Sequence, residues 1–417
     1  MDGWTEYSLG QLLSYEQPAP YIVKSTDYNE KYKTPVLTAG KTFLLGYTDE
    51  DFGVYNSLPV IIFDDFTTAA QYVNFPFKVK SSAMKILTAN AEIVLPKFIF
   101  YRMQIIKVDA STHKRYWIQH YSKIKVKIPS IAEQERIVAR IEELFSQLES
   151  GVETLKKVKQ QLALYRQAVL KEAFEGKFTR EWRQNHISPL PIRDFEKIRI
   201  KGAVFKDTSG DENEIILSIP DTWMKVRLGD VFQVEVGSTP SRRKPEYWNG
   251  DINWVSSGEV HFNTITYTEE HITEEGLNHA STNVHSIGTI MLAMIGEGKT
   301  RGQAAILNTR AAHNQNTAAI LVSETPCHPK FIYYFLQLNY ENTRRVGSGN
   351  NQKALNKERV RALRFPFTSF AEQTIVVQEI ESRISVCDRI EQIVDTALQQ
   401  AEAMRQSILK QAFKGGL

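Results

Sequence analysis

The sequence has little of several features by which common classes of protein are recognised. It contains 2 cysteines among 417 residues, Cys327 and Cys387, too few for a disulfide framework, and this scarcity predicts a reducing, cytoplasmic environment. Its apolar runs are shorter than the roughly 20 residues that cross a bilayer, and its N-terminus lacks the basic and apolar segments of a signal peptide. We therefore expect a soluble protein that is not exported.

An excess of charge of one sign is also missing. The chain has 51 Lys and Arg against 48 Asp and Glu, a net charge of +3, so any nucleic-acid-binding surface has to be local. A single core stops growing near roughly 250 to 300 residues. A chain of 417 residues therefore predicts two or more domains.

The common motifs of catalysis and metal binding are absent as well. The sequence has no Asp/Asn-Pro-Pro-Tyr/Phe motif of adenine methylation, and its 9 histidines show no zinc spacing. Gly298-Lys299-Thr300 resembles the end of a phosphate-binding loop, but Ala293 stands where that loop requires glycine. The adjacent Asp64 and Asp65 favour a turn over a metal site. The sequence thus predicts no catalytic residue, no bound cofactor and no metal in this chain.

What the sequence does contain is a long repeat. Residues 132–176 align without a gap on residues 371–415, and 16 of the 45 paired positions are identical, including the Ala-Glu-Gln that opens each copy. Two unrelated amphipathic helices would share fewer identities, so a duplicated unit is the economical explanation. One such helix alone would favour a hairpin of an ordinary bundle, but two copies separated by a large domain make a bundle hairpin a weaker interpretation.

Each copy lacks proline and spaces its apolar residues alternately three and four positions apart, as a coiled-coil seam does. The predicted seam positions are Ile137, Ile141, Leu144, Leu148, Gly151, Leu155, Val158, Leu162, Val169, Val376, Ile380, Ile390, Val394, Met404 and Ile408.

Topology predicts how the two helices meet. The first helix leads from one domain to the next, so the second has to run antiparallel to pack on it, with a pseudo-two-fold axis across the pair. Full overlap would place Val169 near Val376, Leu162 near Arg383, and Gly151 near Val394. A glycine inside a helix costs about 1 kcal/mol relative to alanine, so Gly151 predicts a close approach of the two backbones. The alternative is that the helices splay apart, each packing on a partner subunit.

The chain is predicted to run domain, helix, domain, helix. We expect globular domains at residues 1–130 and 221–367, long helices at 131–176 and 368–417, and a linker at 177–220 whose composition does not sustain a core. Short apolar runs bounded by Gly, Asn, Asp and Pro indicate that both domains are rich in strands. Both domains also open with Trp followed five residues later by Leu-Gly.

Local signals refine this plan. Residues 92–95 are predicted to form a strand, and residues 121–129 alternate apolar and basic side chains as a half-buried strand does. Ser130 is expected to cap the helix that follows, and Gly176 suits the position just after a helix end.

Several stretches resemble the DNA-specificity subunits of type I restriction-modification systems. The repeated helix opens with Ala-Glu-Gln shortly after a proline and closes with Arg-Gln-x-x-Leu-Lys-x-Ala-Phe-x-Gly, which looks like the spacer helix of that family. Pro129 precedes the first copy, and two extra residues separate Pro366 from the second. Five further stretches resemble the target-recognition domains of the family: residues 34–50, 61–87, 237–260, 296–321 and 347–367.

This resemblance implies an α+β fold in which two globular, strand-rich target-recognition domains are joined by two long antiparallel coiled-coil helices, with a pseudo-two-fold internal repeat. It implies a non-catalytic chain in which each domain reads one half of a bipartite site in double-stranded DNA. It also implies that the helices dock two modification (methyltransferase) subunits and, through them, two restriction (translocase and endonuclease) subunits. S-adenosylmethionine, ATP and Mg²⁺ are then expected on those partners.

Contacts with DNA are predicted in loops rich in basic, amide and hydroxyl groups, because such groups read base edges and hold phosphates. For any one of these residues, a solvated surface role is at least as well supported. The candidates are Lys41, Thr42, Thr67, Thr68, Lys78, Lys80, Lys85, Lys114, Arg115, Ser241, Arg242, Arg243, Lys244, Lys299, Arg301, Gln303, Asn350, Asn351, Gln352 and Lys353.

Two other classes of protein stay open at this point: a non-enzymatic protein-interaction scaffold and a stand-alone DNA-binding regulator. A DNA-binding protein loses affinity steeply as salt rises, which a protein scaffold does not. Co-purification with a methyltransferase distinguishes a specificity subunit from a stand-alone regulator.

Overall fold

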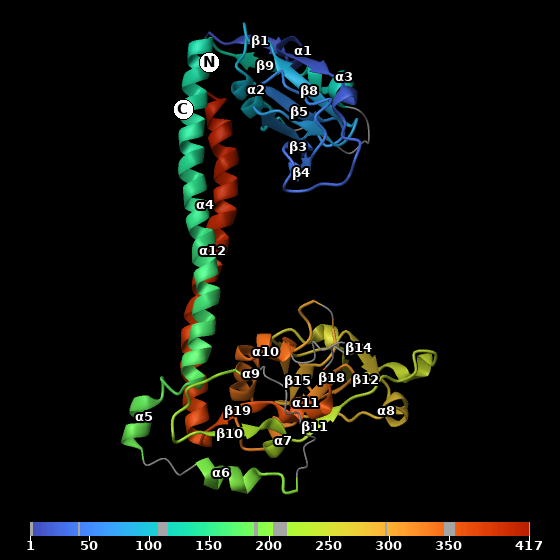
Figure 1. Ribbon diagram of the computed structural model, residues 1–417, viewed down its shortest axis with the longest axis vertical. Helices are drawn as coiled ribbons and strands as arrows, with labels where there is room; N and C mark the ends of the chain where they lie inside the picture. The colour runs from blue at the N-terminus through green and yellow to red at the C-terminus, as the bar shows by residue number, and fades with distance from the viewer. Residues whose placement is uncertain are drawn as a thin grey trace. The chain divides into compact units, whose positions relative to one another are not determined.

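The structure is a computed structural model that describes residues 3–40, 42–106, 116–186, 191–202, 215–296, 298–345 and 355–416. The chain divides into two compact units. Unit 1 comprises Met1–Val158 and Ile393–Leu417, and unit 2 comprises Lys159–Gln392. Each unit holds one globular domain and part of both long helices, α4 (Ile131–Phe174) and α12 (Phe370–Ala412) (Figure 1). None of the described helices is both long and apolar enough to span a membrane.

The domain of unit 1 is built on small sheets. Its strands are β1 (Thr5–Ser8), β2 (Leu13–Glu16), β3 (Thr34–Leu37), β4 (Leu44–Thr48), β5 (Val60–Asp64), β6 (Ala70–Val73), β7 (Lys78–Val79), β8 (Met84–Ala89) and β9 (Lys125–Ile128). In the described part of the chain, one sheet has the order β2-β8-β5-β6 and a second the order β4-β3-β7. The central strand β5 forms from a run of apolar residues that are buried on both faces of the sheet.

Short helices complete this domain: α1 (Leu9–Leu12), η1 (Ala19–Tyr21), α2 (Pro96–Met103), α3 (Tyr116–Gln119) and η2 (Tyr121–Lys123). Helix α2 packs against β5, β6 and β8. The strand predicted at residues 92–95 is wrong: Val94 donates its N–H to the carbonyl of Asn90 at 2.9 Å, which makes a turn, and Leu95 precedes the proline that opens α2. A proline suits the first turn of a helix, where its missing N–H is not needed.

The domain of unit 2 is also rich in strands. They are β10 (Met224–Arg227), β11 (Val234–Val236), β12 (Trp248–Val255), β13 (Asn263–Ile265), β14 (Glu270–Ile272), β15 (Ile290–Ala293), β16 (Ala304–Leu307), β17 (Ala311–His313), β18 (Thr317–Ile320) and β19 (Arg364–Phe367). Within the described ranges the larger sheets have the orders β11-β18-β15-β16-β13 and β14-β12-β17.

The helices of unit 2 are α5 (Arg180–Asn185), α6 (Pro191–Ile198), α7 (Leu228–Val231), η3 (Pro245–Tyr247), η4 (Ser257–Glu259), α8 (Glu274–His279), η5 (Val322–Glu324), α9 (Pro329–Leu338), α10 (Tyr340–Arg345) and α11 (Lys357–Ala362). Two of them, α5 and α6, lie in the segment predicted to be a coreless linker. That prediction is wrong, because Phe195 and Leu217 are buried in the core of unit 2. The apolar residues of this segment are sparse, but they pack into the core formed by the rest of unit 2.

Both domains attach to their helices in the same way. Strand β1 pairs antiparallel with β9, and β10 pairs antiparallel with β19, so in each case the strand that follows the opening Trp pairs with the strand that precedes a long helix. Strand β9 alternates exposed and buried side chains, which confirms the predicted pattern for residues 125–128. Residues 121–123 instead form the 3₁₀-helix η2, so the part of the predicted strand before β9 is wrong. Because β19 keeps the spacing of β9 to its helix, Thr368 takes the place of Pro129. The two extra residues between Pro366 and the second copy are therefore not an insertion, since Pro366 lies within β19.

The two long helices also end alike. Gly176 has a φ of +67° and Gly415 a φ of +79°. The N–H of Gly176 reaches the carbonyl of Ala173 at 2.9 Å, and that of Gly415 reaches Ala412 at 3.4 Å. Glycine adopts this left-handed conformation without a Cβ penalty, so the repeated glycine stops both helices.

Each unit contains an antiparallel contact between α4 and α12 (Figure 1). In unit 1, Arg405 of α12 lies 3.3 Å from the carboxylate of Glu149 in α4. In unit 2, Arg166 of α4 lies 2.5 Å from Asp388 of α12. Arg405 and Asp388 occupy the positions of Arg166 and Glu149 in the second copy of the repeat. The same ion pair is therefore made twice, as a pseudo-two-fold repeat requires.

The burial of the predicted seam is uneven. Ile137, Ile141, Leu162, Val169, Val376, Ile380, Val394 and Ile408 are buried, and Leu144, Leu148, Leu155 and Val158 are partly buried. Ile390 and Met404 are 38% and 54% exposed. A Cβ added at Gly151 would meet no atom within 4 Å, so the predicted close backbone approach there is wrong.

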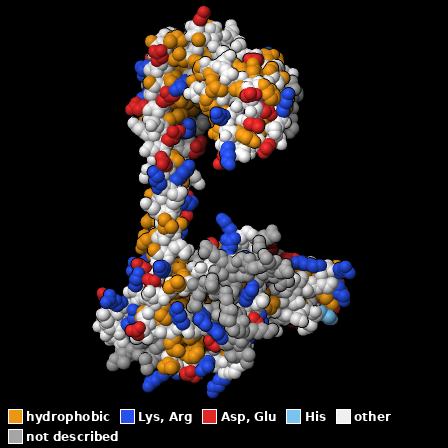
Figure 2. Space-filling view, viewed as in Figure 1, with side chains coloured by type: hydrophobic (Ala, Val, Ile, Leu, Met, Phe, Trp, Pro, Cys, Tyr) orange, Lys and Arg blue, Asp and Glu red, His pale blue; other side chains and the backbone are white. Residues whose placement is uncertain are grey.

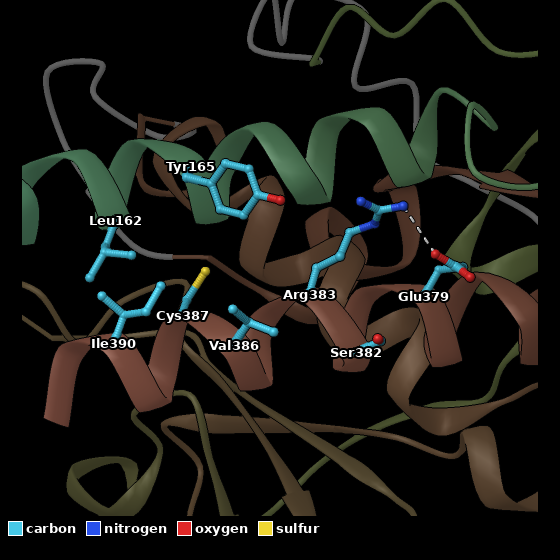
Figure 3. Close-up of a pocket in the computed structure, with 8 residues that line it drawn as sticks. All are labelled: Leu162, Tyr165, Glu379, Ser382, Arg383, Val386, Cys387 and Ile390. Carbon is cyan, nitrogen blue, oxygen red and sulfur yellow. Dashed lines mark hydrogen bonds and ion pairs between the residues drawn. The ribbon is translucent and has the colours of Figure 1, made fainter. Parts of the chain in front are cut away.

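The register of the pair also differs from the prediction. Figure 3 shows Leu162 beside Cys387 and Ile390, whereas full overlap would have set it opposite Arg383. The two helices are thus displaced along each other from the predicted alignment, as the pairs Arg166–Asp388 and Glu149–Arg405 also indicate. Arg383 instead pairs with Glu379 at 3.2 Å and stacks on the ring of Phe178 at 4.1 Å, which satisfies its charge beside apolar neighbours.

Candidate nucleic-acid interface

Lys78 is a structural residue of unit 1. Its side chain is fully buried, its ammonium lies 3.0 Å from the carboxylate of Glu50, and it donates to the carbonyl of Phe52 at 2.7 Å. Burial alone would raise the pKa of Glu50, but the N–H groups of Ser25 and Lys24 and the Lys78 ammonium together lower it. A lysine held in this way cannot reach a phosphate, so the predicted DNA contact at Lys78 is wrong.

Lys85 is buried in the same manner. Its ammonium lies 3.4 Å from Asp65 and donates to the side-chain oxygen of Gln17 at 3.0 Å. Asp65 also accepts the backbone N–H of Trp117 at 2.8 Å. Removing one partner of such a buried pair leaves an uncompensated charge, so Lys85 stabilises the domain, and the prediction of a DNA contact there is wrong as well.

The other described candidates of unit 1 lie at the surface. Thr67 and Thr68 follow β5 in a turn that Asp64 organises by accepting the N–H of Thr67 at 2.8 Å. Thr42 is exposed, and Lys80 is half-buried with its ammonium 3.2 Å from the hydroxyl of Tyr28. These hydroxyl and ammonium groups can contact a phosphate or a base edge.

Arg242 of unit 2 is engaged by two neighbouring side chains. Its guanidinium lies 3.8 Å from the ring centre of Trp248 and forms a two-point ion pair with Glu270, one arm of which measures 2.8 Å. The hydrogen bonds to Glu270 raise the pKa of Arg242 and lower that of Glu270. Arg243 and Ser241 beside it are exposed, and Lys244 donates to the hydroxyl of Tyr247 at 3.1 Å.

A second group of candidates lies in the loop between β15 and β16. Lys299 is exposed, Gln303 is half-buried, and Arg301 donates to the carbonyl of Arg344 in α10 at 2.6 Å. Gly302 has a φ of +86°, which allows the tight turn.

The remaining candidates lie outside the described residues: Lys41, Lys114, Arg115, Asn350, Asn351, Gln352 and Lys353. On the face seen in Figure 2, Lys and Arg side chains are dispersed over both units with acidic side chains among them. This dispersion agrees with the small net charge of +3. Among the described residues, no group of three His, Cys, Asp or Glu side chains is placed to hold a metal ion.

The structure contains one surface that sequence reasoning missed. A groove of about 550 Å³ lies between α4 and α12 in unit 2 and is lined by Leu162, Tyr165, Glu379, Ser382, Arg383, Val386, Cys387 and Ile390 (Figure 3). Tyr165 and Val386 are 47% and 45% exposed. The signal available in the sequence was Val386, an apolar lining residue outside the predicted seam.

Comparisons with known proteins agree on one class. The family model described as type I restriction modification DNA specificity domain matches residues 1–160 and 220–400. The specificity subunit of the Escherichia coli type I restriction enzyme EcoR124I/EcoR124II is 31% identical, over 89% of this chain and 85% of the relative. The EcoBI specificity subunit of E. coli is 23% identical, over 100% of this chain and 86% of the relative.

Solved structures of low sequence identity share the fold. A chain from a study of complex assembly and conformational transition of the type I R-M system covers 100% of this chain and 99% of its own length, with a TM-score of 0.70 and 16% identity. The HsdS subunit of Thermoanaerobacter tengcongensis covers 100% of this chain and 98% of its own length, with a TM-score of 0.52 and 17% identity.

The matched class is thus a DNA specificity protein with two copies of its domain. The chain belongs to the specificity subunits of type I restriction-modification systems. It is a non-catalytic component of such a system, and its part is DNA sequence recognition.

Proposed function

We propose that this subunit reads a bipartite DNA site, with the domain of unit 1 on one half-site and the domain of unit 2 on the other. The supporting observation is the duplication of the attachment of each domain to its helix. The pairing of β1 with β9 recurs as that of β10 with β19. Two equivalent attachments, each carrying a domain of different sequence, suit the reading of two different half-sites.

Contacts with DNA would come from the exposed or half-buried candidates, namely Thr42, Thr67, Thr68, Lys80, Ser241, Arg243, Lys244, Lys299 and Gln303, and from the segments outside the described residues. Arg242 and Arg301 would contact DNA with the N–H groups that remain available. Part of the Arg242 guanidinium is already bonded to Glu270, and part of the Arg301 guanidinium to the carbonyl of Arg344. An Arg that keeps further N–H groups can still read guanine.

The helices would dock two modification (methyltransferase) subunits and, through them, two restriction (translocase and endonuclease) subunits. The groove between α4 and α12 supports this proposal, because a half-apolar groove is a costly surface to leave in water. S-adenosylmethionine, ATP and Mg²⁺ would bind to those partners, and this chain would hold none of them.

The test is to express the chain with its modification subunit and to map the methylated adenines. We expect methylation of one adenine in each half of a bipartite site. Exchange of residues 1–130 for the corresponding domain of another specificity subunit should then change one half-site only. A change in both halves would contradict separate reading, and failure of the chain to co-purify with a methyltransferase would favour a stand-alone regulator.

Binding to a DNA duplex containing the mapped site adds a second readout. Neutralisation of several phosphates makes the affinity fall steeply as the salt concentration rises. An affinity that does not change with salt would favour a protein-interaction scaffold instead.

A further inference from the structure

The glutamine of the first Ala-Glu-Gln ties the helix to its domain. Gln134 is fully buried, and its side-chain oxygen accepts the N–H of Leu95 at 2.8 Å. Its side-chain nitrogen donates to the carbonyls of Ile93 and Pro129, both at 2.9 Å. One amide therefore connects three backbone groups: two in the turn before α2 and one at the start of α4.

The second copy makes the same bridge with different neighbours. Gln373 is also fully buried, its oxygen accepts the N–H of His328 at 3.0 Å, and its nitrogen donates to the carbonyl of Thr368 at 3.0 Å. The nitrogen also lies 3.9 Å from the sulfur of Cys327. Leu95 and His328 correspond, since each directly precedes the proline that opens a short helix, α2 or α9.

This bridge differs in kind from the packing around it. Apolar residues such as Ile137 and Ile141 hold α4 on the domain of unit 1, but hydrophobic contact is non-directional and tolerates small rotations. Hydrogen bonds weaken steeply when their angles change, and a buried amide that loses a partner incurs a desolvation penalty. The glutamine therefore restricts the angle between the domain and the helix.

We propose that Gln134 and Gln373 are positioning residues that fix the orientation of each recognition domain on its helix, and so determine the spacing that the subunit accepts between two half-sites. The effect on spacing rests on the proposed reading of a bipartite site. The effect on orientation does not, and it can be measured without DNA.

The first experiment measures orientation in the purified full chain. Spin labels are attached at Thr67→Cys in the domain and Ser146→Cys on α4, two exposed positions of unit 1; the native Cys327 and Cys387 are buried and react poorly. Gln134→Leu removes all three hydrogen bonds, and Gln147→Leu makes the same change at an exposed position of the same helix. We expect the label-to-label distance distribution to broaden or to shift in Gln134→Leu and to stay unchanged in Gln147→Leu.

The second experiment measures spacing in cells by mapping methylated adenines. In Gln134→Leu or Gln373→Leu, methylation of sites whose spacer is one base pair longer or shorter should rise relative to the native spacer by about tenfold or more, because the loss of a single buried hydrogen bond is already on that scale. The half-site sequences should not change. Gln378→Leu, an exposed change on α12, is the control for Gln373→Leu.

The outcomes separate the two proposals. Unchanged distance distributions in a folded Gln134→Leu chain would overturn the positioning role, and altered orientation with an unchanged spacer preference would overturn its link to spacing. If the unmodified chain methylates no bipartite site, the proposed function fails while the orientation result stands. Should Gln134→Leu not fold, Gln134→Asn retains the amide one methylene short of its partners, and the same distance measurement decides.

Discussion

At the scale of single residues, the two copies of the repeat use the same side chain differently. Glu372 is buried and accepts hydrogen bonds from Thr179 at 2.6 Å, from Arg183 at 2.6 Å and from the indole N–H of Trp223 at 3.0 Å. Its counterpart Glu133 is only partly buried and pairs with Arg136 at 2.7 Å. The difference arises from the segment after α4, which supplies Thr179 and Arg183 and packs in unit 2.

This difference predicts unequal effects of truncation. Glu372→Ala leaves Arg183 buried without its carboxylate, so we expect the free energy of unfolding of unit 2 to fall by about 3 to 5 kcal/mol. Glu133→Ala should change the stability of unit 1 by about 1 kcal/mol or less. Urea denaturation followed by tryptophan fluorescence measures both, and equal losses would contradict a specific role for the buried carboxylate.

A pair of buried histidines makes the stability of unit 2 depend on pH. Burial lowers the pKa of His313 to about 3, and the adjacent His285, whose ring centre lies 4.9 Å away, adds to the shift. Burial also lowers the pKa of His285 itself, although Glu235 opposes this. Below the ordinary value of 6.5 the unfolded chain therefore binds protons that the folded chain does not, and folding is progressively disfavoured.

We expect the free energy of unfolding of unit 2 to fall by up to roughly 1.4 kcal/mol for each unit of pH below 6.5, because that is the linkage for one proton. His313→Phe keeps an aromatic ring that cannot titrate. The free energy of unfolding of this variant should therefore change less between pH 7.5 and 5.5 than that of the unmodified protein. Parallel pH dependences of the two proteins would rule out this role for His313.

At the scale of elements, Gly151 is a defect in α4 that can be repaired. It lies within the helix, is exposed, and has open space where a Cβ would be. Gly151→Ala should therefore raise the free energy of unfolding by about 0.5 to 1 kcal/mol, because alanine has the higher helix propensity and lowers the conformational entropy of the unfolded chain. The melting temperature should rise accordingly.

Gly176→Ala is the matched control for that substitution. A Cβ there would lie 2.5 Å from the Cγ of Pro220, and the φ of +67° disfavours alanine, so this change should destabilise the protein. The comparison fails if both alanines shift the melting temperature in the same direction.

The sequence predicts these elements unequally, for physical reasons. The cap at Gly176, the alternation in β9 and the start of α4 at Ser130 depend on neighbours close in the chain, and each is confirmed. The burial of Lys78 and Lys85 depends on Glu50 and Asp65, each 20 or more residues away, so no local pattern reveals it.

The helix register escaped prediction for a related reason. Apolar spacing specifies that two helices pair but allows several offsets by whole turns. The ion pair of Arg166 with Asp388, made again by Arg405 with Glu149, belongs to one of these offsets only. The repeat contained this information, because both pairs occupy equivalent positions.

At the scale of the whole molecule, the continuous helices predict a relation between helix length and site spacing. Insertion of one heptad after Lys157 and one after Thr396, equivalent positions of the repeat, adds about 10 Å at 1.5 Å per residue. With about 3.4 Å per base pair, the spacer should grow by roughly three base pairs.

Mapping of methylated adenines measures the spacer of whatever sites survive the insertion. A matched insertion in the exposed loop at residues 30–33 should leave the spacer unchanged. An unchanged spacer after insertion in the helices would mean that they do not set the separation of the half-sites.

The aromatic residues at the end of each long helix affect the order in which the two domains fold during synthesis. Phe413, close to the C-terminus, packs 5.2 Å from Phe98 in the core of unit 1, and Phe174 packs 5.0 Å from Phe331 in the core of unit 2. Unit 2 thus receives its aromatic residue from α4, which precedes most of it in the chain, whereas unit 1 receives its own from α12, which follows the domain of unit 2. A ribosome makes the chain from its N-terminus. The domain of unit 1 is therefore synthesised before that of unit 2 but completes its core only after α12 has been made.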